Sequence, residues 1–558
     1  MQPFVSAMTS LRDVLLAAFR SLLRGRSLLR ILLAFWTESK PNHDHQDVGQ
    51  AKVAASPVAD FLADAEHLLL APVEPSRLRD LSRKLKRQFR EALRLNPNCM
   101  LPSYNSQLPT GLESGQYLAL DVGGSTLRVA LVELAGRASQ GLRTSIVRID
   151  SFKISSDVRS LRGVAFFDWM AERIRETVAE DGEKGHSPDH PLIIGMAWSF
   201  PIEQTSSKGG KLCGMGKDFL AAEGLVGQDL GEIINLACRR KGIHVELCAI
   251  VNDSSATLLS KAYTNPSTRF GLILGTGVNI AAHLPVSTID LPKYGDRPSS
   301  WHEKASHVIV NTELGMFGKD ILPLTRWDKL LKAAHPRPDF QPLEQLVSGL
   351  YLGEICRLAL LDAITTTGIF GGTVPPSLQK PYSLDTETLS LIEADSSSSL
   401  STSITLFTSR HPSTVTPTTA DLAFLRALAS YIARRSAAIV AASLFALWEL
   451  KAEAERELIT DASSSPSFAA AAAEAELALS DAKTTVAYNG SVVENYPGYR
   501  DHLQSYIDQL VSISQERRSQ DQGQDQGTVA RGAEGVIALV EARESPLLGA
   551  AVALACLD

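Results

Sequence analysis

Three turns in this chain bring together residue types that bind phosphate or move protons. The first spans residues 121–128, where Gly123 and Gly124 are followed by small hydroxyl side chains and by Arg128. Paired glycines expose backbone N–H groups without a Cβ in the way, as an anion cradle requires, and Arg128 adds a positive charge. A tight turn between two strands looks the same, so this run alone favours a structural hairpin.

The second turn places an amide and an acid, Asn252 and Asp253, directly after the apolar run 245–251. An aspartate at the end of a strand can accept a proton from a substrate hydroxyl, and the neighbouring amide can hydrogen-bond other hydroxyls. The structural alternative is a helix N-cap, a position where Asn and Asp are common. Both interpretations place the pair between a strand and a helix.

The third turn, Gly275-Thr276-Gly277, ends another strand-like run and is followed by Asn279. Its backbone N–H groups and the Thr276 hydroxyl suit a phosphate group. Asn279, which can both donate and accept hydrogen bonds, suits a sugar. This turn thus indicates a phosphate contact beside a sugar contact.

The runs around these turns indicate alternating strands and helices. Residues 117–134 predict two strands joined by a tight turn at Gly123, and the alternation along the chain predicts an α/β architecture. A Ser/Thr/Pro-rich run, 396–419, predicts a surface excursion. The other expected elements are strands at 192–200, 245–251, 270–281, 307–310 and 535–540, helices at 58–95 and 421–452, and an Ala-rich helix at the end of the chain.

Composition narrows the classes of partner. The 558 residues carry a formal net charge of -7, so the totals give no general basic surface, and a nucleic-acid partner is not indicated. The six cysteines are scattered without Cys-x-x-Cys pairs, which argues against a zinc site and against a disulfide framework. A reducing, intracellular compartment fits this pattern best.

The first 36 residues differ in kind from the rest. Leucines recur at helical spacing, arginines accumulate, and Asp13 is the sole acid before Glu38. This pattern predicts a basic amphipathic helix over residues 1–37 that binds a membrane surface or addresses the chain to mitochondria, followed by a linker over 38–57. The alternative is a soluble helix that covers the next domain.

Further short motifs accompany the three turns. They are Ser199-Phe200-Pro201, Lys217, Asn311-Thr312-Glu313-Leu314-Gly315, Ser348-Gly349-Leu350-Tyr351-Leu352-Gly353-Glu354, the run 384–390 and Asn489-Gly490-Ser491-Val492. Together and in this order, the turns and motifs resemble the hexokinase family, in particular fungal-type hexokinases and glucokinases, from about Phe61 to Leu557. Because several independent motifs agree on one architecture, they favour the functional interpretation of each turn over the structural one.

Membership in this family implies an α/β, two-lobed ribonuclease-H-like fold, shared by actin-like ATPases and sugar kinases, with an interlobe cleft. Each lobe would hold a five-stranded mixed sheet with helices. The large lobe maps to residues 58–105 and 252–540, and the small lobe to 106–251 and 541–558. Closure of the lobes over the sugar would exclude water and limit wasteful ATP hydrolysis.

The resemblance also assigns roles to residues. Asp253, Lys217 and Arg128 would be catalytic: Asp253 takes the proton from the sugar 6-hydroxyl, and the two cations offset developing negative charge. The hexose would contact Ser199, Asn252, Asp253, Asn279, Glu313 and Glu344. The nucleotide would contact Asp121, Gly123, Gly124, Ser125, Thr126, Gly275, Thr276, Gly277, Gly490 and Ser491.

The implied activity is ATP-dependent phosphorylation of a hexose at its 6-hydroxyl, with glucose as the first expectation, in a reaction that feeds glycolysis and serves glucose homeostasis. The implied cofactor is ATP with Mg2+, and no protein metal site is implied. The implied partner is the hexose, and the basic amphipathic pattern of residues 1–36 adds a membrane or the mitochondrial surface as a second expected partner. The expected location is the cytosol, in association with mitochondria.

Departures from the family pattern concentrate on the nucleotide side. Thr126 and Leu127 stand where the family has Asn and Phe, and Ala256 adds a Cβ where a glycine is usual. Asp218 places a new carboxylate beside Lys217.

Near the end of the chain, residues 545–549 stand where the family has a Gly-rich nucleotide loop, and Pro546 there lacks an N–H. Two hypotheses from different classes therefore stand: a working hexokinase, or a glucose-binding regulatory protein on the hexokinase fold with little catalysis. An actin-like or chaperone-type ATPase would leave the paired sugar carboxylates Glu313 and Glu344 unexplained.

Overall fold

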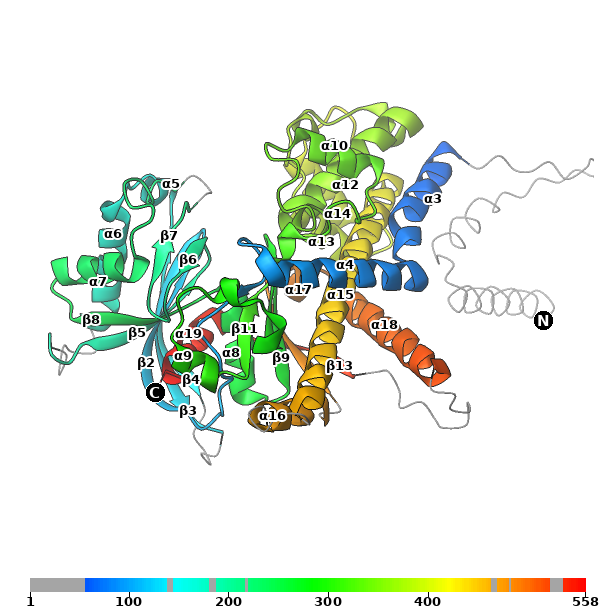
Figure 1. Ribbon diagram of the computed structural model, residues 1–558. Helices are drawn as coiled ribbons and strands as arrows, with labels where there is room; N and C mark the ends of the chain where they lie inside the picture. The colour runs from blue at the N-terminus through cyan, green and yellow to red at the C-terminus, as the bar shows by residue number, and fades with distance from the viewer. Residues whose placement is uncertain are drawn as a thin grey trace, which may run out of the picture. The chain divides into compact units, whose positions relative to one another are not determined.

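Two β-sheets with helices packed on them carry the residues predicted to do chemistry (Figure 1). The computed structural model describes residues 56–137, 144–179, 187–215, 219–462, 469–480, 483–521 and 535–557. Within these residues, strands and helices alternate along much of the chain, as predicted for an α/β protein. The predictions for residues 1–37 and for most of the linker 38–57 lie outside the described residues, and the lobe boundaries stay a prediction.

The first sheet is mixed and has the strand order β4-β3-β2-β5-β8. β2, β5 and β8 run parallel, whereas β3 and β4 are antiparallel to their neighbours. Successive side chains of a strand face opposite sides, so Leu118 and Leu120 pack in one hydrophobic cluster and Ala119 in another. The strands are β2 (Ser114–Val122), β3 (Thr126–Ala135), β4 (Ser145–Lys153), β5 (Leu192–Trp198) and β8 (Val245–Val251).

Helices cover both faces of this sheet. α6 (Val164–Ala179) and α7 (Leu230–Arg240) pack on the Leu120 face, where large apolar side chains fill the space. α8 (Asp253–Thr264) and α19 (Ser545–Ala555) pack on the Ala119 face. Small residues let α19 lie close to the strands: a Cβ on Gly195 would stand 2.2 Å from the Ala550 carbonyl oxygen.

The second sheet is also mixed and has the order β1-β11-β10-β9-β12-β13. The prediction of five strands per lobe is wrong here, because the two-residue strand β1 pairs with β11 and gives six strands within the described residues. The expected strand 270–281 is two antiparallel strands separated by the glycine turn. The strands are β1 (Leu101–Pro102), β9 (Thr268–Leu274), β10 (Val278–Pro285), β11 (His307–Asn311), β12 (Thr484–Asn489) and β13 (Ile537–Glu541).

A 44-residue helix, α15 (Thr419–Ala462), is the long helix predicted for residues 421–452. It packs against α3, α4, α16 and α18, and its buried Arg435 forms a two-point ion pair with Asp328 of α10. Among the described residues, no helix is long and apolar enough to cross a membrane. The neighbouring helices are α3 (Pro57–Leu70), α4 (Pro75–Leu95), α10 (Arg326–Ala334), α12 (Gly349–Thr367), α13 (Thr386–Ala394), α16 (Ala469–Ser480) and α18 (Tyr499–Asp521).

The Ser/Thr/Pro-rich run 396–419 lies largely at the surface, as predicted, but it contains a helix that the composition did not indicate. Residues Ser401–Arg410 form helix α14, and Phe407 on this helix is buried. Phe407 packs against Phe370 and His411 with ring centroids 5.2 and 5.0 Å apart. One well-placed aromatic therefore anchors a segment whose composition is typical of a loop.

Candidate active site

Three parallel strands end at one edge of the five-stranded sheet. β2 and β5 pair up to Val122 and Trp198, and β8 ends beside β5. The turns that follow, which begin at Gly123, Ser199 and Asn252, therefore emerge at the same edge, where ligands bind in open α/β sheets. The Ser199 N–H donates a hydrogen bond to the Val122 carbonyl oxygen at 3.2 Å, which ties two of these turns together.

Asn252 and Asp253 stand where β8 ends and α8 begins. Asn252 Oδ1 accepts a hydrogen bond from the Ser254 N–H at 2.9 Å, and Asp253 Oδ1 accepts from the same N–H at 2.7 Å. The N-cap interpretation is therefore confirmed for Asn252. It is compatible with a functional role for Asp253, because the cap fixes this carboxylate at the positive end of a helix.

A chain of side-chain hydrogen bonds runs from this edge to the second sheet. Asn279 Nδ2, at the start of β10, donates to Asn252 Oδ1 at 3.5 Å and to Asn311 Oδ1 at 2.8 Å. Asn311, the last residue of β11, donates from Nδ2 to Glu313 Oε1 at 2.8 Å. Three predicted sugar contacts, Asn252, Asn279 and Glu313, are thus held in one network.

Two carboxylates, Glu313 and Glu344, lie close enough to this network to interact electrostatically with each other. Glu313 has a left-handed backbone, with φ of 53° and ψ of 51°, a conformation that is uncommon outside glycine and is found often at functional sites. Burial raises the pKa of Glu313, the Asn311 amide opposes this, and the Glu344 carboxylate raises the pKa further. Glu344 Oε2 accepts a hydrogen bond from the Val278 N–H at 3.0 Å, beside the glycine turn.

The turn 275–277 forms a backbone cradle with the segment that follows β12. A Cβ on Gly275 would lie 3.3 Å from the Ser491 nitrogen. Gly490 has a φ of 127°, and a Cβ there would lie 2.5 Å from the Leu274 carbonyl oxygen, so glycine is required at this position. The predicted phosphate contacts of these two segments are therefore adjacent.

The turn between β2 and β3 is the tight glycine turn predicted from the sequence. The Gly123 N–H donates to the Thr126 carbonyl oxygen at 3.1 Å, which closes the turn. Arg159 Nη2 donates to the Gly124 carbonyl oxygen at 3.0 Å, and the Ile154 N–H donates to the Ser125 carbonyl oxygen at 2.9 Å. The turn is thus held from both sides by its neighbours.

Arg128, predicted to offset phosphate charge, pairs with two carboxylates. It donates from Nε and Nη2 to Asp121 Oδ2 at 2.9 and 2.6 Å, and from Nη1 to Glu544 Oε2 at 2.6 Å. Burial raises the pKa of Asp121, which the Arg128 cation opposes and the Glu544 carboxylate reinforces. Glu544 has a left-handed backbone with φ of 49°, so a strained residue places this second carboxylate on Arg128.

The segment 545–549, expected as a damaged nucleotide loop, is the first turn of α19. Pro546 lies at its start, where a missing N–H costs nothing because the first N–H groups of a helix have no partner within it. A Cβ on Gly549 would lie 2.1 Å from the Ala256 carbonyl oxygen, so Gly549 permits the contact between α19 and α8. The close helix approach that Ala256 was expected to disturb is therefore preserved.

Lys217 and its neighbour Asp218 lie outside the described residues. Two residues were missed as site members. Asn311 could have been found from the sequence, because it opens the motif 311–315 that also contains Glu313. Glu544 gave none, because its contact with Arg128 joins residues that are 416 positions apart in the chain.

The described residues fit ATP on one side of the site. Residues 275–277 and Gly490 with Ser491 pack closely against each other where β9 and β12 end, and glycine turns of this kind, with hydroxyl residues in them, suit phosphate oxygens. Within the described residues, no group of three or more His, Cys, Asp or Glu side chains is placed to hold a metal ion. In such sites Mg2+ is carried largely by the phosphates of the nucleotide.

Comparison with known families gives two adjacent matches. Residues 67–263 and residues 269–556 each match a family model described as hexokinase. The junction between the two matches falls between α8 and β9, at the point where the chain passes to the second sheet.

The relatives that match this chain include proteins from plants and fungi. Hexokinase-9 of Oryza sativa subsp. japonica is 34% identical over 361 residues, which are 63% of this chain and 68% of the relative. Hexokinase-2 of Candida albicans is 34% identical over 341 residues, covering 61% of this chain and 68% of the relative.

Solved structures share the fold. The hexokinase of Schistosoma mansoni, solved with glucose, matches with a TM-score of 0.68 at 24% identity, over 89% of this chain and 99% of that one. A second hexokinase structure matches with a TM-score of 0.66 at 25% identity, over 89% of this chain and all of the other. With the two family matches and the two-sheet architecture, these likenesses lead to one conclusion: the chain belongs to the hexokinase family, whose members are ATP:hexose phosphotransferases.

Proposed function

We propose that the protein phosphorylates glucose at the 6-hydroxyl with MgATP as the phosphoryl donor. The observation that carries the proposal is the hydrogen-bonded chain from Asn252 through Asn279 and Asn311 to Glu313, next in sequence to Asp253. Amides that donate and accept, together with carboxylates that accept, match the mixed hydroxyls of a sugar. The Schistosoma mansoni relative, solved as a complex with glucose, supports the choice of sugar.

Asp253 is the general base in this proposal. Its carboxylate stands in the first turn of α8, where the Ser254 N–H holds it in place. The carboxylate accepts the proton of the 6-hydroxyl as that oxygen attacks the phosphoryl group. Lys217, by family resemblance, offsets the negative charge that develops at the same oxygen.

Glu313 and Glu344 supply sugar selectivity. The charge of Glu313 is disfavoured by burial and by the neighbouring Glu344 carboxylate, which together raise the pKa of Glu313. Hydroxyl groups that donate to these carboxylates stabilise their ionised forms. A ligand without those hydroxyls leaves buried charges unsatisfied and is rejected.

ATP supplies the phosphoryl group and, with Mg2+, much of the charge neutralisation during its transfer. The backbone of residues 275–277 and of Gly490 would hold phosphate oxygens, and the Thr276 and Ser491 hydroxyls would add donors. On the other sheet, the turn 123–125 presents further backbone groups at the edge shared with Asn252.

A second candidate function is a glucose-binding regulator with little catalysis. The observation that favours it is the Arg128–Glu544 ion pair, because a carboxylate lies on the cation predicted to receive phosphate charge. In this function the sugar network binds glucose, and the bound glucose regulates the protein without being phosphorylated.

The test combines calorimetry with glucose alone and a coupled assay with glucose and MgATP. The kinase proposal predicts glucose binding and turnover in the wild-type protein. The Asp253→Asn variant should lose about 10²- to 10⁴-fold in kcat, because general base catalysis is removed, while its glucose affinity stays within a few-fold.

The matched control is Asp157→Asn, which changes an exposed aspartate of the short helix α5 (Ser156–Arg159) and should leave both measurements unchanged. Glucose binding without turnover would establish the regulator instead. Absence of glucose binding in the folded wild-type protein would overturn both functions.

We also propose that residues 1–36 associate the protein with a membrane, the mitochondrial surface in particular, while the catalytic body faces the cytosol. The support is the Arg-rich, acid-poor amphipathic pattern of that segment. Cell fractionation of the full chain and of a chain starting at residue 37 tests this. Equal distribution of the two between membrane and soluble fractions would contradict the proposal.

A further inference from the structure

The turn between β2 and β3 has its carbonyl oxygens bound within the protein. Three consecutive carbonyl oxygens accept hydrogen bonds at 2.9 to 3.1 Å: Gly124 from Arg159, Ser125 from Ile154 and Thr126 from Gly123. The N–H groups of Gly124 and Ser125, by contrast, donate to no acceptor among the described residues. The turn therefore keeps two backbone donors available for a ligand.

The peptide that joins Gly124 to Ser125 shows where one of these donors points. Its carbonyl oxygen lies 3.0 Å from Arg159 Nη2. The C=O and N–H groups of a trans peptide point in opposite directions, so the Ser125 N–H points away from Arg159. Ser125 is exposed whereas Arg159 is half-buried, which places this N–H on the open side of the turn.

The bond from Arg159 fixes this peptide and strengthens its N–H as a donor. Gly124 has no Cβ to restrict rotation, so the orientation of the peptide depends on the partner that its carbonyl finds. A hydrogen bond to the carbonyl oxygen polarises the peptide, and a charged donor does so more strongly than a neutral one. Successive N–H groups presented in this way form the concave anion sites that bind phosphate.

Arg159 itself is held in place by the segment that begins at Phe219. The Leu220 N–H donates to the Arg159 carbonyl oxygen at 3.0 Å. The guanidinium lies over the Phe219 ring, 5.7 Å from its centroid, at a distance where a cation is attracted to an aromatic face. Phe219 is buried and packs edge-on against Phe166. The guanidinium is thus positioned by the fold before any ligand binds.

The charge of Arg159 is not taken up by a carboxylate of the described residues. Its Nε is buried without a hydrogen-bond partner there, and its Nη2 bonds to a neutral carbonyl oxygen. Arg128, on the same hairpin, differs because Asp121 and Glu544 both pair with it. Arg159 is therefore the cation beside this turn whose charge remains available to an anion.

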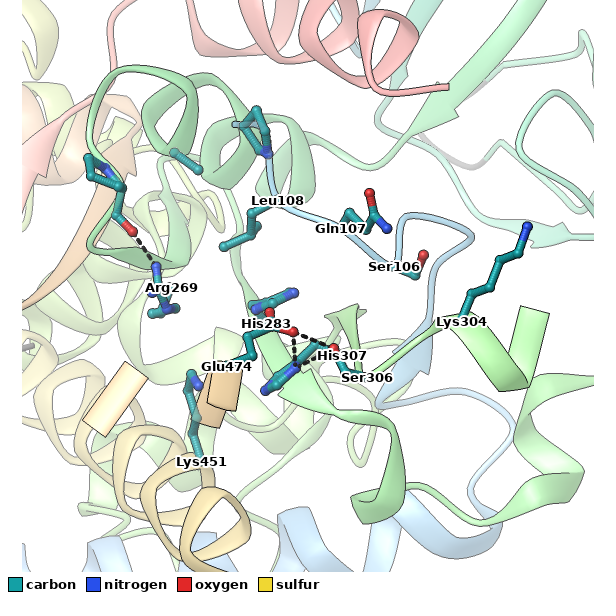
Figure 2. Close-up of a pocket in the computed structure, with 13 residues that line it drawn as sticks. Ser106, Gln107, Leu108, Arg269, His283, Lys304, Ser306, His307, Lys451 and Glu474 are labelled. Carbon is teal, nitrogen blue, oxygen red and sulfur yellow. Dashed lines mark hydrogen bonds and ion pairs between the residues drawn. The ribbon is translucent and has the colours of Figure 1, made fainter. Parts of the chain in front are cut away.

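A cavity of about 410 Å³ at the second sheet shows how the fold compensates other buried cations. Lys451 Nζ donates to Glu455, and both oxygens of this glutamate lie 3.1 Å from His307 Nε2. Glu474 Oε2 lies 3.3 Å from His307 Nδ1, and Figure 2 shows the two side chains facing each other at the cavity. Arg159 has no such carboxylate among the described residues.

We propose that Arg159 is a positioning residue for the phosphate groups of ATP. It holds the peptide between Gly124 and Ser125 with the N–H toward a phosphate oxygen, and it places an unpaired positive charge behind that peptide. The inference rests on the proposed function, in which the turn 123–125 contacts the nucleotide. Arg159 acts through the turn, and it supplies the charge that Glu544 takes up on Arg128.

The experiment is calorimetry of the full chain with glucose and, separately, with the magnesium complex of the non-hydrolysable ATP analogue AMPPNP. Arg159→Gln replaces a charge-assisted hydrogen bond by a neutral one at most, and a polar side chain suits this half-buried position. Its AMPPNP affinity should fall about tenfold. Arg159→Lys keeps the charge and should stay within about threefold of the wild type. Glucose affinity should be unchanged in both variants, because other segments make the sugar network.

The matched control is Arg162→Gln, three residues further along the chain. Arg162 is exposed and pairs with Glu223, so this variant should bind AMPPNP as the wild type does. An AMPPNP affinity within twofold of the wild type in Arg159→Gln would overturn the proposal. Equal losses of glucose and AMPPNP affinity would also overturn it, because they would reveal a general structural role, and so would an Arg159→Lys variant as weak as Arg159→Gln.

The binding measurement needs no turnover, so the inference and the proposed function can fail separately. Wild-type protein that binds AMPPNP and glucose but phosphorylates no glucose would overturn the kinase function alone. Wild-type turnover together with unchanged AMPPNP affinity in Arg159→Gln would overturn the role of Arg159 alone. Absence of AMPPNP binding in the folded wild-type protein would overturn the role of Arg159 directly.

Discussion

The sugar side and the nucleotide side of the candidate active site are built by different means. On the sugar side, Asn252, Asn279, Asn311 and Glu313 hold one another through side-chain hydrogen bonds. On the nucleotide side, the cradle of residues 275–277 and 490–491 consists of backbone packed so closely that glycine is required at Gly490.

This difference explains where the chain departs from its family. The departures lie outside the cradle, in elements whose backbone is regular: Thr126 and Leu127 lie within the β2–β3 hairpin, and Pro546 lies within the first turn of α19. A network of side chains depends on each of its members, because each one satisfies a half-buried hydrogen-bond partner. The retained residues on the sugar side are the ones that the network needs.

The largest effect expected on glucose binding comes from breaking the middle of the sugar network. Asn311→Ala removes the partner of Asn279 and of Glu313 together, and leaves a buried carboxylate with one donor fewer. Loss of one neutral and one charge-assisted hydrogen bond should weaken glucose binding about 100-fold, measured by calorimetry. The KM for ATP should stay within about twofold, because the cradle is made by other segments.

The control for this variant is Asn98→Ala, which changes an exposed asparagine outside the network. Circular dichroism establishes that both variants are folded. A glucose affinity within threefold of wild type in Asn311→Ala would show that the network positions nothing that the sugar contacts.

Gly275→Ala tests the nucleotide side. Unlike Asn311→Ala, it adds a carbon atom to the site and removes no hydrogen-bonding group. The new Cβ would lie 3.3 Å from the Ser491 nitrogen, inside the space assigned to phosphate. The KM for ATP should rise about tenfold while glucose affinity is unchanged, as for the loss of one phosphate contact.

Gly123→Ala is the matched control, because the nearest atom to its Cβ would be the Thr126 carbonyl oxygen at 3.6 Å, an ordinary contact. Its effect on the KM for ATP should be smaller than that of Gly275→Ala. The reverse order would mean that the β2–β3 turn, and not the cradle, is the tighter phosphate contact.

Glu544→Gln removes a carboxylate from the nucleotide side without altering the backbone. Arg128 keeps its bonds to Asp121 and loses an anionic competitor for phosphate. The kcat/KM for ATP should rise by about three- to tenfold, the size of one partly exposed ion pair. The control is Glu541→Gln. It removes a carboxylate three positions before Glu544 that pairs with Arg543 instead of Arg128. Unchanged ATP kinetics in Glu544→Gln would show that the Arg128–Glu544 pair does not limit nucleotide use.

The sequence predicted the parts of the fold that local patterns encode. The glycine turn at Gly123, the strand that ends at Val251 and the long helix around Arg435 follow from hydrophobic periodicity and turn residues alone. The sugar residues were named from motifs, and the network then joined Asn252, Asn279 and Glu313.

Other features were out of reach because they depend on contacts between distant segments. The pair Arg128–Glu544, the buried group around His307 and Glu455, and the sixth strand all join residues far apart in the chain. The helical start of segment 545–549 was missed for a different reason. A family loop was expected there, although a proline near the first helical position is itself a helix signal.

The smallest expected effect separates stability from function on the sugar side. Because burial raises the pKa of Glu313 above its ordinary value of 4.5, the folded protein binds that proton more tightly than the unfolded chain does. The ionised carboxylate therefore lowers the free energy of unfolding. This loss grows as pH rises from 4.5 through the raised pKa and then levels off.

Glu313→Gln should raise the free energy of unfolding by about 1 kcal/mol at neutral pH and by little near pH 4, in urea titrations. Its glucose affinity should fall, whereas Glu303→Gln, an exposed control, should change neither quantity. A Glu313→Gln variant that is less stable than wild type at neutral pH would contradict this prediction. It would show that the ionised carboxylate stabilises the folded protein.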